Sequence, residues 1–89
     1  MTDSSLKLAA MISIQMRLET KLTPKIIDHE LGSAIKVSKN RKHLGGVIIS
    51  EDDVGITIAA GIKDKAPQDV HDYLIKIVMQ YNTESSTVH

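Results

Sequence analysis

Four cationic side chains lie close together in the chain, at Lys36, Lys39, Arg41 and Lys42. Clustered Lys and Arg bind phosphate, and the glycines that follow at 45–46 would let a backbone come near a sugar–phosphate chain. The same residue types are typical of a solvated connection between strands. The segment 36–43 therefore predicts either a phosphate contact or an exposed loop.

Other residues that could do chemistry lack the spacing of a known site. The acidic run 51–53 has three consecutive carboxylates, whereas a calcium loop alternates its ligands. His29 and His71 stand beside carboxylates on separate elements, without the His-x-x-x-His spacing that pairs two imidazoles on one helix. The sequence has no Gly-x-Ser-x-Gly elbow and no phosphate-binding glycine loop. We therefore expect no enzymatic activity, no metal and no cofactor.

The composition indicates one small domain with an aliphatic core. The chain has 89 residues and no cysteine, so packing or self-association must stabilise it without disulfides. Tyr73 and Tyr81 are its only aromatic residues, which counts against single-strand binding by base stacking and against aromatic interface hot spots. The N-terminal stretch does not fit a secretory signal, and no apolar run is long enough to span a membrane. We expect a soluble, cytoplasmic protein.

The net charge is zero, but the charges are unevenly distributed along the chain. Residues 1–44 hold eight Lys or Arg and four Asp or Glu, whereas residues 45–89 hold three and seven. If folding separates the two halves, the molecule is an electric dipole suited to head-to-tail self-contact or to an oppositely charged partner. If the halves interleave, the asymmetry has no consequence.

Two helices are predicted in the N-terminal part. The first covers 2–22, with an apolar stripe made by Leu8, Met11, Ile12, Leu18 and Leu22. Thr23 and Pro24 form a helix start signal, which predicts a short second helix over 23–32. The pattern leaves open whether this segment is separate or continues the first helix.

Three strands and a last helix are predicted in the remainder. Residues 33–40 alternate as a strand, 40–46 form a connection, and 46–50 and 55–63 form a hairpin around the acidic turn. In the second hairpin strand one face carries Ile56, Ile58, Ala60 and Ile62, and the other carries Thr57, Ala59 and Gly61. The last helix covers 64–82, with a stripe made by Val70, Leu74, Ile77 and Tyr81. A flexible polar tail follows over 83–89.

These elements predict an α/β (α+β) fold: a two-layer sandwich in which two or three helices cover one face of a three-stranded, mostly antiparallel sheet. The single domain spans 1–82. The small residues Thr57, Ala59 and Gly61 would leave their face of the sheet bare, or closely approached by a second copy.

Residues 46–81, GVIISEDDVGITIAAGIKDKAPQDVHDYLIKIVMQY, resemble the bacterial alkaline-shock protein family in the spacing of their apolar residues. The resemblance implies a non-enzymatic, self-associating protein that binds partner proteins, and it carries over no catalytic residue. The chain departs from the family in having no room for a strand before its first helix and no further strand after its last.

We therefore expect a protein–protein interaction module whose first partner is itself and whose other protein partner is unidentified. The expected interface joins the small sheet face to the spare side of the first helix: Ala9, Met16, Thr57, Ala59 and Gly61. The alternative is a nucleic-acid-binding adaptor that contacts phosphates through Lys36, Lys39, Arg41 and Lys42.

Overall fold

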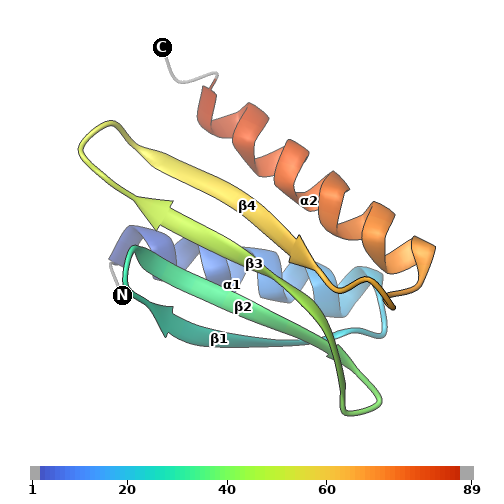
Figure 1. Ribbon diagram of the computed structural model, residues 1–89. Helices are drawn as coiled ribbons and strands as arrows, with labels where there is room; N and C mark the ends of the chain where they lie inside the picture. The colour runs from blue at the N-terminus through green and yellow to red at the C-terminus, as the bar shows by residue number, and fades with distance from the viewer. Residues whose placement is uncertain (1–2, 87–89) are drawn as a thin grey trace.

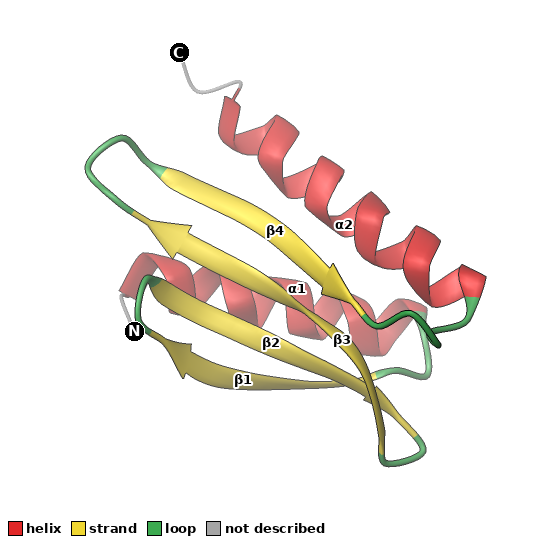
Figure 2. Cartoon of the chain, in the orientation of Figure 1, coloured by secondary structure: helices red, strands yellow, loops and turns green. Residues whose placement is uncertain are grey.

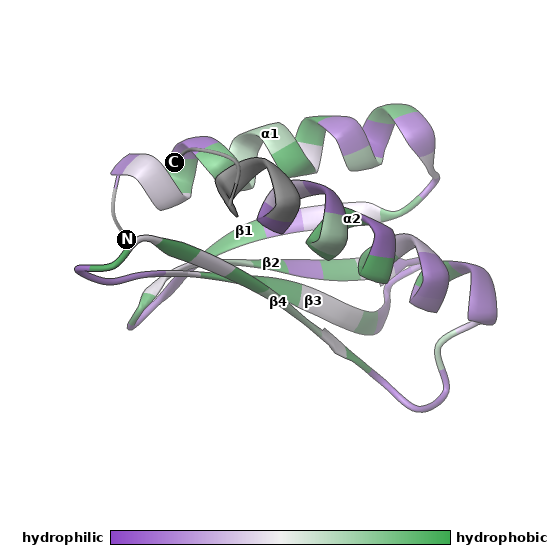
Figure 3. Cartoon of the chain, turned by 90° about the horizontal axis from the view of Figure 1, so that it is seen from above, coloured by the Kyte–Doolittle hydropathy of each residue, from purple (hydrophilic) through white to green (hydrophobic). Residues whose placement is uncertain are grey.

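The computed structural model describes residues 3–86, which form two helices and one four-stranded antiparallel sheet (Figure 1). The elements in chain order are α1 (Asp3–Glu19), β1 (Thr23–His29), β2 (Gly32–Lys39), β3 (Lys42–Glu51), β4 (Ile56–Ile62) and α2 (Gln68–Ser86). The strands pair in sequence order, and both helices cover the same face of the sheet (Figure 3). The predicted α+β class and the one-sided helical cover are confirmed, but the sheet has four strands.

The additional strand is β1, where the sequence predicted a second helix (Figure 2). Its residues pair with β2, with Pro24 opposite Val37 and Ile27 opposite Ala34. The Thr-Pro signal was misread, because proline also fits an edge strand, where its missing N–H need not enter a ladder. The consecutive β-branched Ile26 and Ile27 favour the strand.

The connection predicted over 40–46 is also wrong, because most of it is the beginning of β3. The actual turn between β2 and β3 is the pair Asn40–Arg41, with φ angles of 53° and 66°. Two successive residues with positive φ make the tight hairpin turn whose twist matches that of the flanking strands. Residues 39–42 of the basic segment are therefore the tip of a tight hairpin.

The core lies between the sheet and the two helices. Its wholly or almost wholly buried members on the strands are Ile35, Val37, Val47, Ile49 and Ile58. The α2 stripe that the sequence predicted is buried against them: Val70, Leu74, Ile77 and Tyr81. The predicted alternation of β4 is also confirmed, because Thr57, Ala59 and Gly61 are exposed while Ile58 is buried.

The predicted stripe on the first helix is correct at Ile12 and Leu22, which are buried, but wrong at Met11 and Leu18. Met11 and Leu18 are 56% and 82% exposed, while Ala9 and Met16 are fully buried against the sheet. Apolar residues surround most of α1, so their spacing does not select one face. The buried face is fixed instead by packing, and by a 2.8 Å hydrogen bond between the buried hydroxyls of Ser5 and Ser33 on β2.

The C-terminal boundary differs slightly from the prediction. The segment 83–89 was predicted to be a flexible tail, but α2 continues through Ser86. Residues 87–89 lie outside the described part of the chain. Within that part, neither helix combines the length and the apolar character that crossing a membrane requires.

The outer edge of β4 is occupied by a side chain of α2. The amide group of Asn82 accepts a hydrogen bond from the backbone N–H of Ile58, at 3.1 Å, and donates one to its carbonyl, at 2.9 Å. Asn82 thus imitates a neighbouring strand at the middle of this edge. At the other edge, Pro24 removes one backbone donor from β1. Both devices oppose the pairing of a second chain with the edges of the sheet.

Two glycines stand opposite each other on β3 and β4, and they differ in what surrounds them. A Cβ on Gly46 would lie 2.7 Å from the carbonyl oxygen of Ile35, so this position requires glycine for close strand packing. A Cβ on Gly61 would meet no atom within 4 Å. Gly61 faces open space on the uncovered side of the sheet.

We predict opposite effects on stability from Gly46→Ala and Gly61→Ala. The first should lower the free energy of unfolding by about 1–3 kcal/mol, because the methyl group collides with backbone atoms. The second should raise it by about 0.5 kcal/mol, because alanine loses less conformational entropy on folding. Urea unfolding of both variants at low protein concentration measures the difference, and equal effects would contradict the geometry.

Candidate functional site

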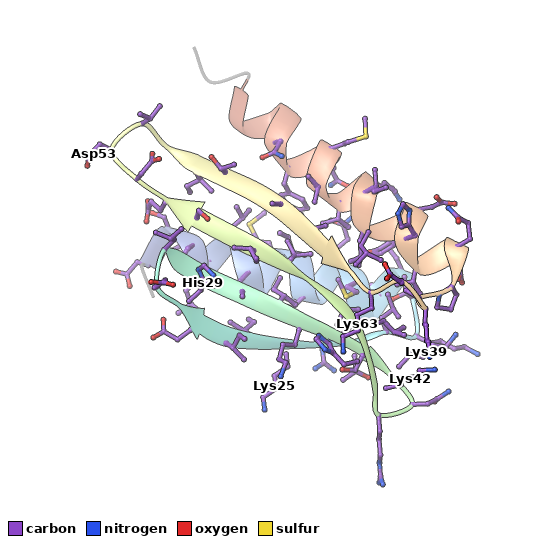
Figure 4. The ribbon with its side chains drawn as sticks, in the orientation of Figure 1. Lys25, His29, Lys39, Lys42, Asp53 and Lys63 are labelled. Atoms are coloured by element: carbon purple, nitrogen blue, oxygen red, sulfur yellow. The ribbon has the colours of Figure 1, made fainter. Side chains whose placement is uncertain are left out.

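The charged residues are sorted to the two ends of the sheet. The α1–β1, β2–β3 and β4–α2 connections lie at one end, where cations outnumber carboxylates. The cations are Lys21, Lys39, Arg41, Lys42, Lys63 and Lys65, and the carboxylates among them are Asp64 and, beside Lys21 and Lys39, Glu19 and Asp69. The β1–β2 and β3–β4 connections lie at the other end, which carries Asp28, Glu30, Glu51, Asp52 and Asp53. Figure 4 shows Lys39, Lys42 and Lys63 at the first end and Asp53 at the second. We call these the basic end and the acidic end.

The tip of the basic end combines two unfavourable features. Lys39 and Lys42 are directly opposite each other as the last pair before the turn, and like charges in that position destabilise a hairpin. Arg41, between them, has the positive φ that glycine or asparagine accepts more readily. An arginine at this position therefore carries a steric cost that glycine would not.

A pocket of about 710 Å³ opens beside this tip. Its rim is cationic and its floor is apolar, and its lining residues are Arg41, Lys42, His43, Leu44, Ile62, Lys63, Asp64, Lys65 and Ala66. The chain brings Lys63 here because its backbone N–H donates to the carbonyl of Leu44, at 3.0 Å, where β4 ends beside β3. The pocket therefore joins two basic segments that are distant in the sequence.

The cations of this pocket are not neutralised within the protein. In the described part of the chain, one lysine forms a side-chain ion pair: Lys76 of α2 pairs with Glu19 of α1. No carboxylate among the described residues lies within ion-pairing distance of Arg41, Lys42 or Lys63. Asp64 lines the pocket without pairing, so the site keeps an excess of positive charge.

The structure divides the predicted phosphate-binding residues between two places. Lys39, Arg41 and Lys42 lie together at the tip, whereas Lys36 stands on the uncovered face of the sheet, opposite Lys25 of β1. Sequence reasoning missed Lys63 and Lys65 as members of the basic end. Their contribution required knowledge that β4 ends where the β2–β3 hairpin begins.

The uncovered face of the sheet is flat and built from small or β-branched residues. Its cross-strand rows are Lys25–Lys36–Gly46–Gly61 and Ile27–Ala34–Ile48–Ala59. No element of the described chain covers it (Figure 3). A shallow depression of about 390 Å³ lies where Gly46 and Gly61 leave side-chain space empty.

The expected interface residues divide between the surface and the core. Thr57, Ala59 and Gly61 lie exposed on the uncovered sheet face, as their alternation predicted. Ala9 and Met16 do not lie on a spare side of the helix, because both are fully buried in the core. That part of the expectation is corrected: these two side chains are inaccessible to a partner.

Polar contacts along the seam between the helices hold them together over the sheet. Gln15 accepts a 2.6 Å hydrogen bond from the Tyr81 hydroxyl, and Glu19 accepts one of 2.8 Å from Tyr73. The bond from Gln15, with that from Tyr73 and the charge of Lys76, lowers the pKa of Glu19 below its usual range. Burial and the contact with Glu19 raise the pKa of Tyr73. The seam is structural, and its end at Tyr73 borders the basic end, because Tyr73 lines a small pocket together with Lys21 and Lys39.

The two histidines considered as metal ligands lie far apart in the fold. His29 ends β1 at the acidic end, while His71 lies in the first turns of α2, which begins at the opposite end. Across the described residues, no three or more His, Asp or Glu side chains are grouped so that they could hold a metal ion.

Comparisons with family models, with curated proteins and with solved structures each gave no match for this chain. They do not bear on the resemblance of residues 46–81 to the alkaline-shock protein family, which stays a prediction. The function must therefore be argued from the two surfaces described above.

We predict that Arg41→Gly stabilises the fold. Glycine accepts positive φ without the steric cost that a side chain pays, so the free energy of unfolding should rise by about 1 kcal/mol. Thermal unfolding followed by circular dichroism measures the effect. A lower stability of this variant would show that the arginine side chain supports the turn.

Proposed function

We propose that this protein is a non-enzymatic interaction module that self-associates through the uncovered face of its sheet. The observation that carries the proposal is the row Ile27–Ala34–Ile48–Ala59, an apolar line across all four strands with no covering layer. In this row Ala59 is exposed, Ile27 and Ile48 are half-buried, and Ala34 is buried between its neighbours. A second sheet of the same kind would pack on it face to face, as in a sandwich. The blocked edges of β1 and β4 leave the face as the better route for association.

The basic and acidic ends of the sheet favour one relative orientation of the two copies. In one arrangement the basic ends of both copies lie together, which is repulsive. In the other arrangement, a two-fold axis lies between the two sheets and perpendicular to their strands. Each basic end then lies over the acidic end of the other copy. Lys25 and Lys36, which repel each other within one copy, then lie near the acidic turns of the second copy. We propose this antiparallel, closed dimer.

The size of the face indicates a weak dimer. Four strands about 4.8 Å apart and about seven residues long give a footprint of roughly 19 by 23 Å. Two such footprints amount to roughly 900 Å², below the 1,200–2,000 Å² of stable complexes. The self-association should therefore be reversible and dependent on protein concentration.

We predict that Ala59→Arg abolishes the dimer while the monomer stays folded. The added side chain stands in the middle of the apolar row and prevents the close approach of two flat faces. Sedimentation velocity over a range of concentrations should show a dissociation constant raised at least tenfold, about 1.4 kcal/mol. Circular dichroism checks that the fold is retained.

Leu18→Arg is the matched control, since it places the same charge at an 82% exposed site on α1. It should leave self-association unchanged. If this variant dissociates the dimer and Ala59→Arg does not, the interface lies on the helical layer and the proposal is wrong. Added salt should weaken the original dimer, because opposite charges face each other across it.

A further inference from the structure

We infer that the tip of the basic end is a binding site for the phosphate backbone of duplex DNA, formed by Lys39, Arg41, Lys42, Lys63 and Lys65. This site lies outside the uncovered sheet face and is complete in a single copy, so its binding of duplex DNA can be measured on the monomer. Lysines and arginine supply sequence-independent affinity by neutralising phosphates and releasing counterions.

The first argument is that several features of the tip destabilise the free protein. Two lysines face each other directly, an arginine occupies a turn position with φ of 66°, and no described carboxylate pairs with any of the three. Each feature is unfavourable in the free protein. An anion that lies between Lys39, Arg41 and Lys42 would turn the repulsion into attraction.

The second argument is that the site is wider than one phosphate. The hairpin supplies three cations, and the segment that follows β4 supplies Lys63 and Lys65 on the far rim of the 710 Å³ pocket. Cations distributed along two segments suit a ligand with several phosphates in series. They exceed what one isolated phosphate could contact.

The third argument distinguishes a duplex from a single strand. Single-strand binding relies on aromatic side chains that stack on bases. Here Tyr81 is buried, and Tyr73, which lines a small pocket with Lys39, donates to Glu19 and has the Lys76 ammonium over its ring at 5.7 Å. The chain has no Phe and no Trp. Without an open stacking surface, affinity must come from phosphates, and a duplex carries them at about twice the density of one strand along its axis.

The shape of the tip agrees with this ligand and not with a membrane. Residues 39–42 extend the β2–β3 ribbon beyond the last residues of β4 (Figure 1), and a two-stranded ribbon fits the roughly 12 Å major groove of B-DNA. A membrane site would need apolar side chains beside the cations. The large exposed apolar residues of the described chain lie elsewhere: Leu6, Met11, Ile14, Leu18, Leu31, Val54, Ile75 and Met79.

The test is a titration of fluorescein-labelled duplex DNA with the full chain at several salt concentrations, with single-stranded DNA and inorganic polyphosphate as parallel probes. If the tip neutralises four phosphates, the plot of log K against log salt should have a slope of about −3.6 for the duplex. Single-stranded DNA should bind more weakly.

Two variants test the site without endangering the fold. Arg41→Gly relaxes the turn, and Lys39→Glu replaces a like-charge pair by an opposite-charge pair with Lys42. Both should therefore melt no lower than the original protein, yet both should bind the duplex several-fold more weakly. Arg41→Gly should reduce the slope by about 0.9. Lys7→Glu, which makes the same charge change on exposed α1, is the control and should bind as the original does.

The inference is overturned if no probe binds at low salt, or if Lys7→Glu weakens binding as much as Lys39→Glu. It is also overturned if polyphosphate or single-stranded DNA binds and the duplex does not. Ala59→Arg, which removes the proposed dimer, should keep one duplex site per chain. Loss of the dimer in Ala59→Arg therefore tests the proposed function alone, and loss of duplex binding in that variant would count against the DNA site.

Discussion

The one-sided burial of the sheet is the constraint on which the rest of this structure depends. Both helices pack on the face that carries Ile35, Val47 and Ile49, and nothing in the described chain covers the other face. The seam between the helices, held by Glu19 and Gln15, keeps that arrangement fixed. One face of the sheet is therefore left bare within the described chain, and it is the surface that we propose the protein offers to a second copy.

The same topology explains the separation of charge. In an up-and-down meander, successive turns lie at alternate ends of the sheet. Acidic and basic groups alternate along the chain at the spacing of one strand, near 28–30, 39–42, 51–53 and 63–65. The alternation places like charges at the same end. One end repels itself and lacks internal partners, and this end carries the proposed DNA site.

The sequence was sufficient to predict those elements for which several independent sequence signals indicate the same structure. The β3–β4 hairpin combines strict alternation with β-branched residues, and α2 combines a clear stripe with Pro67 and Asp69 at its start, so both could be predicted. It was insufficient where one signal has two meanings. Thr23-Pro24 fits a helix start and an edge strand equally, and an apolar surround on α1 leaves its buried face undetermined. Those choices are made by packing.

The candidate sites likewise include residues that could be predicted from the sequence and residues that could not. The exposed face of β4 followed from alternation alone, and the basic tip was visible as a charge cluster. The role of Lys63 and Lys65 could not be predicted, because it depends on which strand ends beside the hairpin. Treating β1 as a helix also hid the charge alternation, since the acidic group at 28–30 was not recognised as a turn of the sheet.

The most direct test of the account is a dilution series of the labelled protein followed by two-dimensional NMR. If the uncovered face is the contact surface, amide signals from Ile27, Ile48 and Ala59 should shift with concentration, while those from Ile14 and Met79 on the helical layer stay constant. The reverse pattern, with shifts confined to the helices, would contradict the claim that one-sided burial of the sheet creates the surface by which this protein associates.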